Sequence, residues 1–294
     1  MDQATRLRMM VNQHHNEQKD YAKKAKVVTV TSGKGGVGKT NITINTALTL
    51  AQQGKKVVIL DADLGLSNIE VLLGVIPTAT LSDLIFGQKN VKDILTSGPL
   101  GVQFISSGSG VDDLVHLNSS QIQEFINKLQ PLEEMADIVL IDTGAGVSDT
   151  VMQFIQASDE TVVVVTPEPT SITDAYALIK TVRNNARVKG FLPKIHLLVN
   201  RADTLAEGQE VFNKIFQASR KFLNMPVYHL GSVPYDRKVI EAVKLQKPFC
   251  LSYPDSAATK AIRTIGRSLI DLPHEPAKNT GLGEFMKKLF HLIG

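Results

Sequence analysis

The sequence predicts an α/β fold with a mostly parallel central sheet and helices on both of its faces. Two observations predict it: short β-branched runs recur along the 294 residues, and helix-sized segments separate them. Most of the runs are apolar without alternation, which is typical of strands that are covered on both faces. The expected strands are 26–31, 55–63, 101–107, 136–143, 160–166, 194–201 and 226–234. The clearest helical patterns are 39–53, 119–130, 171–187, 205–223 and 236–246.

Polar side chains stand at the ends of several of these strands. The runs end in Asp61, Asp142, Thr166 and Asn200. Ligands of open α/β sheets bind beyond the carboxyl ends of the strands, so these side chains are expected to gather around a ligand.

Composition excludes little but sets the compartment. The formal net charge of +3 is too small to indicate nucleic acid by itself. The single cysteine, Cys250, rules out an internal disulfide and favours a reducing cytosol. The first twenty residues lack the apolar run of a signal peptide, and no stretch approaches a spanning helix. We therefore expect a cytoplasmic protein.

The chain divides into four segments. Residues 1–25 are a polar N-terminal tail, and residues 26–270 carry the strand and helix patterns of one domain. Residues 271–280 contain two prolines and no apolar periodicity, which indicates a linker. Residues 281–294 form a last, apolar segment.

The stretch SGKGGVGKT, residues 32–40, fits the phosphate-binding pattern G-x-x-x-x-G-K-[ST] between a strand and a helix. Its backbone N–H groups and the following helix N-terminus favour phosphate oxygens. Lys39 is expected to reach the β- and γ-phosphates and Thr40 to bind Mg²⁺. Asn41, the next residue, receives no assigned role. The predicted nucleotide cradle is Gly33, Lys34, Gly35, Gly36, Val37, Gly38, Lys39 and Thr40.

A second lysine, Lys34, follows the first glycine of this loop. It could be a solvated surface lysine, or it could reach a nucleotide held by a second copy of the protein, as an arginine finger does in trans. Spacing alone leaves both alternatives open.

The run GKGGVGKT resembles the deviant Walker A signature of the MinD/ParA class of P-loop ATPases. The resemblance implies an enzyme that hydrolyses ATP to ADP with Mg²⁺ and forms a homodimer in the ATP state. It also implies that Lys34 contacts ATP in the opposing subunit, while Lys39 contacts the ATP of its own subunit.

Two further segments are similar to the switches of that class. DADLGLSN (61–68) resembles switch I, which implies that Asp63 polarises the attacking water and that Asp61 lies near the Mg²⁺. IDTGAG (141–146) resembles switch II, with Asp142 as the metal-side carboxylate. Phosphoryl transfer needs a metal and a group that orients water. Taken singly, each aspartate could instead cap a helix or turn.

Segments 198–203 and 231–249 resemble the adenine-contacting segments of the class. They imply base contacts from Asn200, Pro234 and Asp236, with Arg201 and Tyr235 as weaker candidates; Asn200 could instead cap a turn. In 166–180 the resemblance implies a partner contact from Asp174. Alternatively, one of Ser171, Thr173 and Asp174 is a helix N-cap.

The last segment, GLGEFMKKLFHLIG, has one apolar helical face flanked by two lysines. It is too short to span a bilayer and favours a helix lying on an anionic membrane surface, with docking on the domain as the alternative. Two such helices on one ATP dimer would bind by avidity. The face comprises Leu282, Phe285, Met286, Leu289, Phe290 and Ile293.

The first residues resemble the activator motif of the FlhG family (also called YlxH or FleN), MinD-like ATPases that control flagellar number and placement. The matching residues are Asp2, Gln3, Ala4, Leu7 and Arg8. The resemblance implies that they bind and stimulate FlhF, a GTPase of the signal-recognition-particle type. Flagellar C-ring components are further expected partners.

Two alternative functions would use the same nucleotide site. A ParA-type DNA-partitioning ATPase would use a basic patch, for which Lys180, Arg183, Arg187, Lys189 and Lys194 are candidates, although they could equally be an ordinary solvated face. A MinD-type division-site regulator would lack the N-terminal motif.

Overall fold

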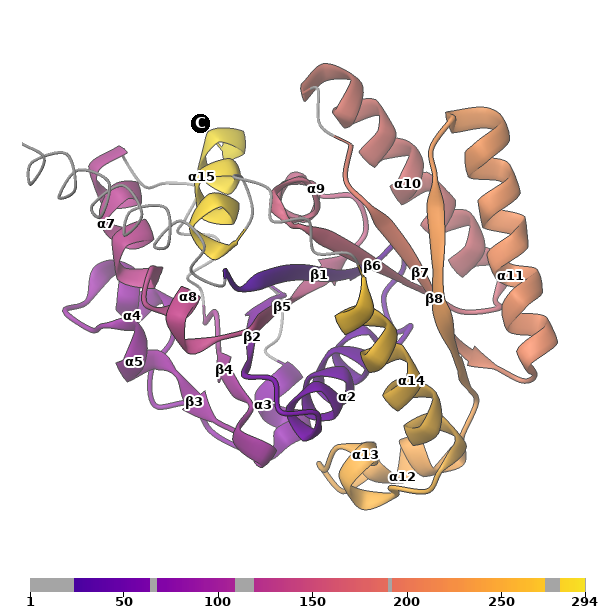
Figure 1. Cartoon of the computed structure of the whole chain (residues 1–294), viewed down its shortest axis with the longest axis horizontal. Coiled ribbons are helices and arrows are strands. Elements are labelled where there is room, and N and C mark those ends of the chain that lie inside the picture. The colour runs from indigo at the N-terminus through magenta and orange to yellow at the C-terminus, as the bar shows by residue number, and fades with distance from the viewer. Residues whose placement is uncertain (1–23, 64–67, 109–118, 190–191, 273–280, 294) are drawn as a thin grey trace, which may run out of the picture.

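The computed structural model describes residues 24–63, 68–108, 119–189, 192–272 and 281–293. Its centre is an eight-stranded sheet in the order β3-β4-β2-β5-β1-β6-β7-β8 (Figure 1). All neighbouring strands are parallel except β3, which pairs antiparallel with β4 at one edge. The strands are β1 (Lys26–Ser32), β2 (Val57–Ala62), β3 (Thr96–Ser97), β4 (Gln103–Ile105), β5 (Ile138–Ala145), β6 (Glu160–Val165), β7 (Ile195–Ala202) and β8 (Val227–Pro234). The predicted fold class is confirmed.

The central strands read as unbroken apolar runs because both faces of the sheet are covered. In β1, Val28 and Val30 enter one core cluster while Val27 enters another. In β5, Leu140 and Ile141 separate in the same way. Successive side chains of a strand point to opposite faces, so an apolar residue at every position fills two cores at once.

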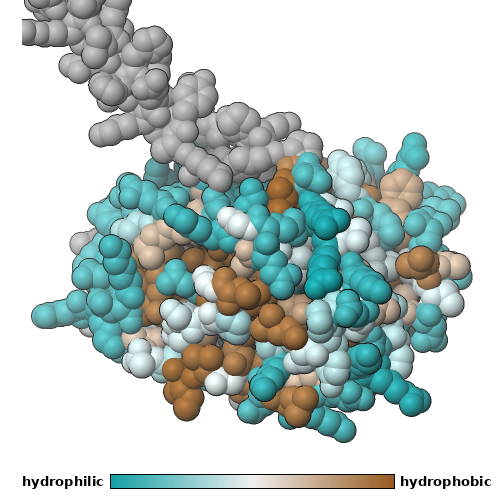
Figure 2. Space-filling view, turned by 60° about the horizontal axis from the view of Figure 1, so that its bottom comes forward, coloured by the Kyte–Doolittle hydropathy of each residue, from teal (hydrophilic) through white to brown (hydrophobic). Residues whose placement is uncertain are grey.

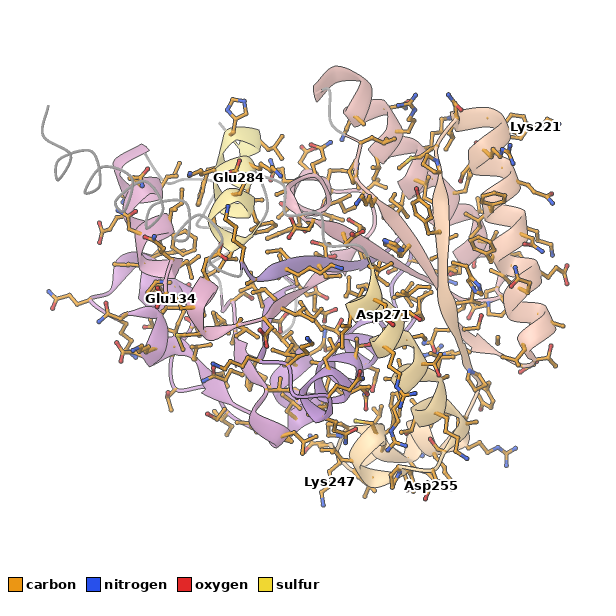
Figure 3. All side chains as sticks on the ribbon, in the orientation of Figure 1. Glu134, Lys221, Lys247, Asp255, Asp271 and Glu284 are labelled. Carbon is orange, nitrogen blue, oxygen red and sulfur yellow. The ribbon has the colours of Figure 1, made fainter. Side chains whose placement is uncertain are left out.

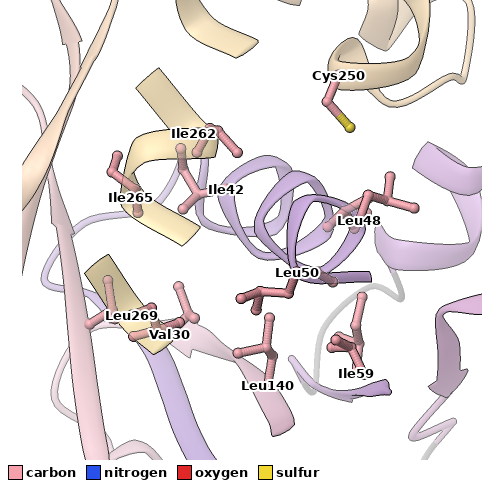
Figure 4. Packing of buried hydrophobic residues seen from close by; sticks show 14 of the residues in the cluster. Val30, Ile42, Leu48, Leu50, Ile59, Leu140, Cys250, Ile262, Ile265 and Leu269 are labelled. Carbon is pink, nitrogen blue, oxygen red and sulfur yellow. The ribbon is translucent and has the colours of Figure 1, made fainter. Parts of the chain in front are cut away.

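One face of the sheet is covered mainly by α2 (Lys39–Gln52) and α14 (Ala257–Asp271), with α3 (Asn68–Leu73), α12 (Arg237–Lys244) and α13 (Phe249–Ser252) beside them. Figure 4 shows the packing of α2 and α14 on strand residues, with Leu50, Leu140 and Ile59 in one layer. Helix α14 is capped by Ser256, whose Oγ accepts from the Thr259 N–H at 3.1 Å. Such a cap satisfies a backbone donor that the helix itself leaves free.

The other face carries α9 (Asp149–Ala157), α10 (Pro169–Lys189) and α11 (Leu205–Ala218), with α7 (Ser119–Leu129) and the last helix towards the β4 edge. The remaining short elements are α4 (Leu81–Phe86), α5 (Val91–Ile94), α8 (Leu132–Met135), the 3₁₀ turn η1 (Pro99–Gly101) and the π turn η2 (Ser219–Leu223). The helix expected over 205–223 therefore ends at Ala218 and continues as a π turn. The sequence patterns single out neither α9 nor α14.

The last segment forms α15 (Leu282–Ile293), which packs against α7, α8, α9 and β1 (Figure 1). Leu282, Phe285, Met286, Leu289 and Phe290 are 1–6% exposed. Their apolar face is therefore covered by the domain in this structure, as the docking alternative predicts; membrane binding by this helix stays a prediction.

Two aromatic pairs fix α15 in its groove. Phe285 stacks on Phe154 of α9 with ring centroids 6.1 Å apart, and Phe290 meets Phe125 of α7 edge-on at 5.8 Å. The Glu133 carboxylate of α8 accepts the Gly283 N–H at 2.7 Å and the Ala25 N–H at 3.0 Å. One carboxylate thus holds the start of α15 beside the residue that leads into β1.

Two surface observations complete the fold. None of the helices in the described part is both long and apolar enough to cross a membrane. The face brought forward in Figure 2 shows hydrophobic residues, in brown, grouped among hydrophilic ones. Val71 of α3 and Ile240 of α12 are 51% and 45% exposed.

Candidate functional site

The register of the sheet brings the two predicted metal-side aspartates together. Asp61 of β2 is the direct neighbour of Asp142 of β5, and Asp142 is also the neighbour of Val30 in β1. The loop 33–38 directly follows β1, and α2 then begins at Lys39. Both carboxylates therefore lie at the strand ends beside the phosphate loop, where the sequence predicts them.

Glycines shape the loop for reasons that the structure makes explicit. Gly36 and Gly38 have φ of +77° and +95°, backbone angles that residues other than glycine rarely adopt. A Cβ on Gly33 would lie 2.2 Å from the backbone carbon of Asp174, so the start of the loop packs directly on α10. The helix N-cap is Gly38, which places no side chain over the N–H groups at the start of α2. An anion fits such a helix start.

The two aspartates are buried carboxyl groups whose negative charges a bound cation would compensate. Burial, with the nearby Asp142 charge adding to it, raises the pKa of Asp61 to about 7. Burial also raises the pKa of Asp142 to about 6, although hydrogen bonds from Thr40 and Thr43 and the Lys39 charge oppose the shift. Oδ2 of Asp61 is buried without a hydrogen-bond partner in the described residues. These carboxylate oxygens fit Mg²⁺, whose oxygen ligands include carboxylates, hydroxyls and phosphates.

These protein groups do not make a complete metal site alone. Within the described ranges, no group of three or more His, Cys, Asp or Glu could hold an ion. Phosphate oxygens and water would have to supply the rest of the coordination, as is usual for Mg²⁺ in nucleotide sites.

Asp63 follows β2 and lies next to the switch II segment. Its backbone N–H donates to Asp61 Oδ1 at 3.2 Å, and a Cβ on Gly144 would be 3.4 Å from Asp63 Oδ1. The two switch-like segments are therefore adjacent. Residues 64–67 of the first lie outside the described residues.

Lys34 is engaged within its own subunit in this structure. Its Nζ donates to Glu168 Oε2 and to Thr170 Oγ1, each at 2.8 Å, and the Lys34 side chain is 36% exposed. The Lys34 hydrogen bond and charge lower the pKa of Glu168. The Lys34 ammonium is thus paired with the connection between β6 and α10 and with the first turn of α10.

The base-side candidates have structural partners. Asn200 Nδ2 donates to the Val37 carbonyl at 2.7 Å, and Asn200 Oδ1 accepts from the Arg201 N–H at 3.0 Å. Asp236 caps α12 by accepting from Lys238 N at 3.0 Å, and its other oxygen accepts from Ala258 N at 3.3 Å. Pro234 ends β8, the edge strand beside β7.

Other candidates fare differently. The Ser171 hydroxyl accepts from the Thr166 N–H at 3.0 Å, which ties the loop between β6 and α10. Within the basic set, Arg183 Nε donates to the Leu223 carbonyl at 3.0 Å and Lys194 lies 3.9 Å from Glu160. The N-terminal residues Asp2, Gln3, Ala4, Leu7 and Arg8 lie outside the described residues.

Sequence patterns missed three residues of the site. Thr43 donates to Asp142 Oδ1 at 3.0 Å, and Glu168 and Thr170 bind Lys34. Thr43 stands one helical turn after Lys39, a spacing that could have indicated it. Glu168 lies on the short connection between β6 and α10, but nothing in the sequence pairs it with Lys34.

Comparison with known proteins agrees with this geometry. A family model of the ParA group, described as NUBPL iron-transfer P-loop NTPase, matches residues 23–270. The antiactivator FleN of Pseudomonas aeruginosa is 40% identical over 259 residues, which cover 88% of this chain and 91% of FleN. The flagellum site-determining protein YlxH of Helicobacter pylori is 30% identical over 100% of this chain and 99% of its own.

Solved structures agree on the fold. MinD of Aquifex aeolicus superimposes with a TM-score of 0.66 at 23% identity, covering 85% of this chain and 99% of that one. MinD of Pyrococcus horikoshii, solved with Mg-ADP, has the same TM-score and identity over 86% of this chain. The phosphate loop, the paired aspartates and these matches together show that the chain belongs to the ParA/MinD family of P-loop NTPases, among the relatives of FleN and YlxH.

Proposed function

We propose that this protein is an ATP-hydrolysing regulator of flagellar number and placement. The observation that carries the proposal is its similarity to FleN and YlxH along nearly the whole chain, combined with the nucleotide-site geometry. In this cycle ATP joins two copies, the dimer acts on its partners, and hydrolysis separates the copies.

The chemistry assigns each site residue a role. Backbone N–H groups of 33–38 and the ammonium of Lys39 hold the β- and γ-phosphates. Thr40, Asp61 and Asp142 would hold Mg²⁺ with the phosphates, and the ion would neutralise charge that develops during phosphoryl transfer. Asp63, beside Gly144, orients the attacking water.

Lys34 acts across the dimer in this proposal. Its contacts with Glu168 and Thr170 are those of a subunit that has not dimerised. Lys34 leaves these contacts to reach the nucleotide of the second copy. Because the Lys34–Glu168 pair is exposed, leaving it costs little. The resting contact therefore keeps Lys34 near the site without preventing dimer formation.

The C-terminal helix provides a reversible membrane contact. Burying each of its five apolar side chains contributes at most about 1.5–3 kcal/mol. In a membrane the helix face is buried again, but the groove that it leaves is exposed to water, so one helix alone binds weakly. Two helices on an ATP dimer bind by avidity. This reconciles the docked helix with ATP-dependent membrane binding.

The N-terminal segment supplies the partner contact. Residues 2–8 bind and stimulate FlhF, and flagellar C-ring components are further partners. A MinD-type division-site regulator remains the alternative if deleting residues 2–8 leaves the rate of GTP hydrolysis by FlhF unchanged. Of the DNA-binding alternative's basic residues, Arg183 and Lys194 already have partners within the chain. Steep salt-dependent binding of DNA by the ATP form would support that alternative.

Sedimentation with anionic liposomes tests the membrane cycle. The full chain, a chain lacking 281–294, Lys34→Ala and the exposed control Lys260→Ala are compared with ATP and with ADP. We expect pelleting that needs ATP, the last helix and Lys34 together, with Lys260→Ala behaving as the full chain does. An ATP dimer that never pellets would contradict the membrane proposal and leave α15 as a structural helix.

A further inference from the structure

We propose that Asn200 is a positioning residue that fixes the phosphate loop, so that the base side and the phosphate side of the site are mechanically linked. The inference rests on the proposed nucleotide site, but assigns Asn200 a role other than reading the base. Asn200 lies near the end of β7 and is 8% exposed.

The first step is the double use of the Asn200 amide. Its NH₂ group donates to the Val37 carbonyl at 2.7 Å, across 163 residues of sequence, and its oxygen accepts from the Arg201 N–H at 3.0 Å. A side-chain amide can donate and accept at once, whereas an aspartate at this position could only accept. The residue type therefore matches both contacts.

The second step is the fit between Asn200 and its surroundings. A Cβ on Gly38 would lie 2.6 Å from Asn200 Nδ2, so only glycine leaves room for the amide here. On the other side, Arg201 has φ of +59°, a left-handed conformation that costs free energy for a residue with a side chain. The bond from Arg201 N–H to Asn200 Oδ1 helps to hold that conformation.

The third step connects these contacts to phosphate binding. No peptide bond among the described residues is cis. In a trans peptide the C=O and the following N–H point in opposite directions. By holding the Val37 carbonyl, Asn200 therefore directs the Gly38 N–H the opposite way within the same peptide plane, away from the Asn200 amide, where this loop would receive phosphate oxygens.

This assignment differs from the base contact that the family resemblance implies for Asn200. If Asn200 reads adenine, its amide has to exchange at least one of its present contacts for the base. If it holds the loop, it contributes equally to any ligand with the same phosphates. A ligand that has the phosphates but lacks a base distinguishes the two.

The test measures the affinity of Mg-ATP and of Mg-tripolyphosphate by competition with a fluorescent nucleotide. The variants are Asn200→Ala and the near-isosteric Asn200→Asp, which keeps the acceptor for Arg201 N–H and loses the donor to Val37. The control is Asn213→Ala on the exposed face of α11. Thermal unfolding confirms that each variant is folded at the assay temperature.

We expect both Asn200 variants to weaken ATP and tripolyphosphate together, by about tenfold, the effect of one buried hydrogen bond. The preference for ATP over GTP should stay as in the wild type, a readout that a base-reading residue would change. Weaker ATP binding with unchanged tripolyphosphate binding overturns the inference in favour of base reading, and no change with either ligand overturns it as well. A wild-type chain that binds neither ligand contradicts the proposed function instead.

Discussion

Lys34 Nζ lies 2.8 Å from Glu168 Oε2 of the same subunit, across 134 residues of sequence. This contact places the distinctive lysine of the loop on the β6–α10 connection and not on the phosphates that Lys39 serves. A lysine that acts in trans needs a position outside its own phosphate cradle, and this ion pair provides one.

Replacing Glu168 tests whether the pair holds Lys34 in the separate subunit. Glu168→Gln removes the charge, so Lys34 leaves more readily and the ATP dimer becomes more stable, by about fivefold or less for an exposed pair. The effect should shrink at high salt because exposed charges are screened. Sedimentation velocity with ATP measures the dimer constant.

The exposed pair Glu210–Lys214, with N···O of 2.7 Å, gives the matched control, because Glu210→Gln breaks a similar pair on α11. We expect it to leave the dimer constant unchanged. Weaker dimerisation of Glu168→Gln would mean that Glu168 is needed in the ATP dimer itself, and the resting-contact interpretation would be wrong.

Sequence patterns reach the parts of this site that are local in the chain. The loop 33–38 and Asp142 stand in contiguous motifs at strand ends, so their juxtaposition follows from a parallel sheet. The contacts Lys34–Glu168, Asn200–Val37 and Glu133–Gly283 join residues 134, 163 and 150 positions apart. No periodicity encodes such pairs.

The C-terminal helix illustrates the same limit. Its periodicity predicts a helix with one apolar face, which the structure has. An apolar face, however, carries no information on whether lipid or protein covers it. Deciding that requires the groove formed by α7, α8 and α9, whose residues are scattered through the chain.

Truncating Phe285 tests whether α15 is docked in solution. The side chain is 1% exposed and stacks on Phe154, so Phe285→Ala should lower the free energy of unfolding by about 3–5 kcal/mol. Urea unfolding of the nucleotide-free protein measures the change, with the exposed His291→Ala as control. Equal stability of Phe285→Ala and wild type would show that the helix is undocked without nucleotide.

Glu133 should control how readily α15 leaves the groove. Its two oxygens accept the Ala25 and Gly283 N–H groups, and Glu133→Gln replaces one acceptor by a donor. We expect faster proteolysis within 281–294 and some liposome pelleting without ATP. The neighbouring Glu134→Gln is the control, because Glu134 is exposed on α8 (Figure 3). Identical behaviour of the two variants would contradict a holding role for Glu133.

The paired aspartates predict how stability depends on pH in the metal-free protein. The pKa of Asp61 is raised to about 7 and that of Asp142 to about 6, with burial as the largest cause of each shift. A carboxyl group with a raised pKa in the folded state stabilises the fold fully below its unfolded pKa, near pH 4. That contribution is lost as the pH rises through about 6 to 7.

We therefore expect the melting temperature without Mg²⁺ or nucleotide to fall between pH 5 and pH 8, and to fall less in Asp61→Asn, which carries no charge to bury. The difference corresponds to a few kcal/mol at most. Asp255→Asn is the control, because Asp255 is exposed on the loop before α14 (Figure 3). Mg²⁺ with ADP should restore stability at pH 8 in the wild type more than in Asp61→Asn, since the ion compensates the charge that burial penalises. A wild-type melting temperature that rises from pH 5 to pH 8, in parallel with Asp61→Asn, would mean that Asp61 is ionised and compensated without a metal.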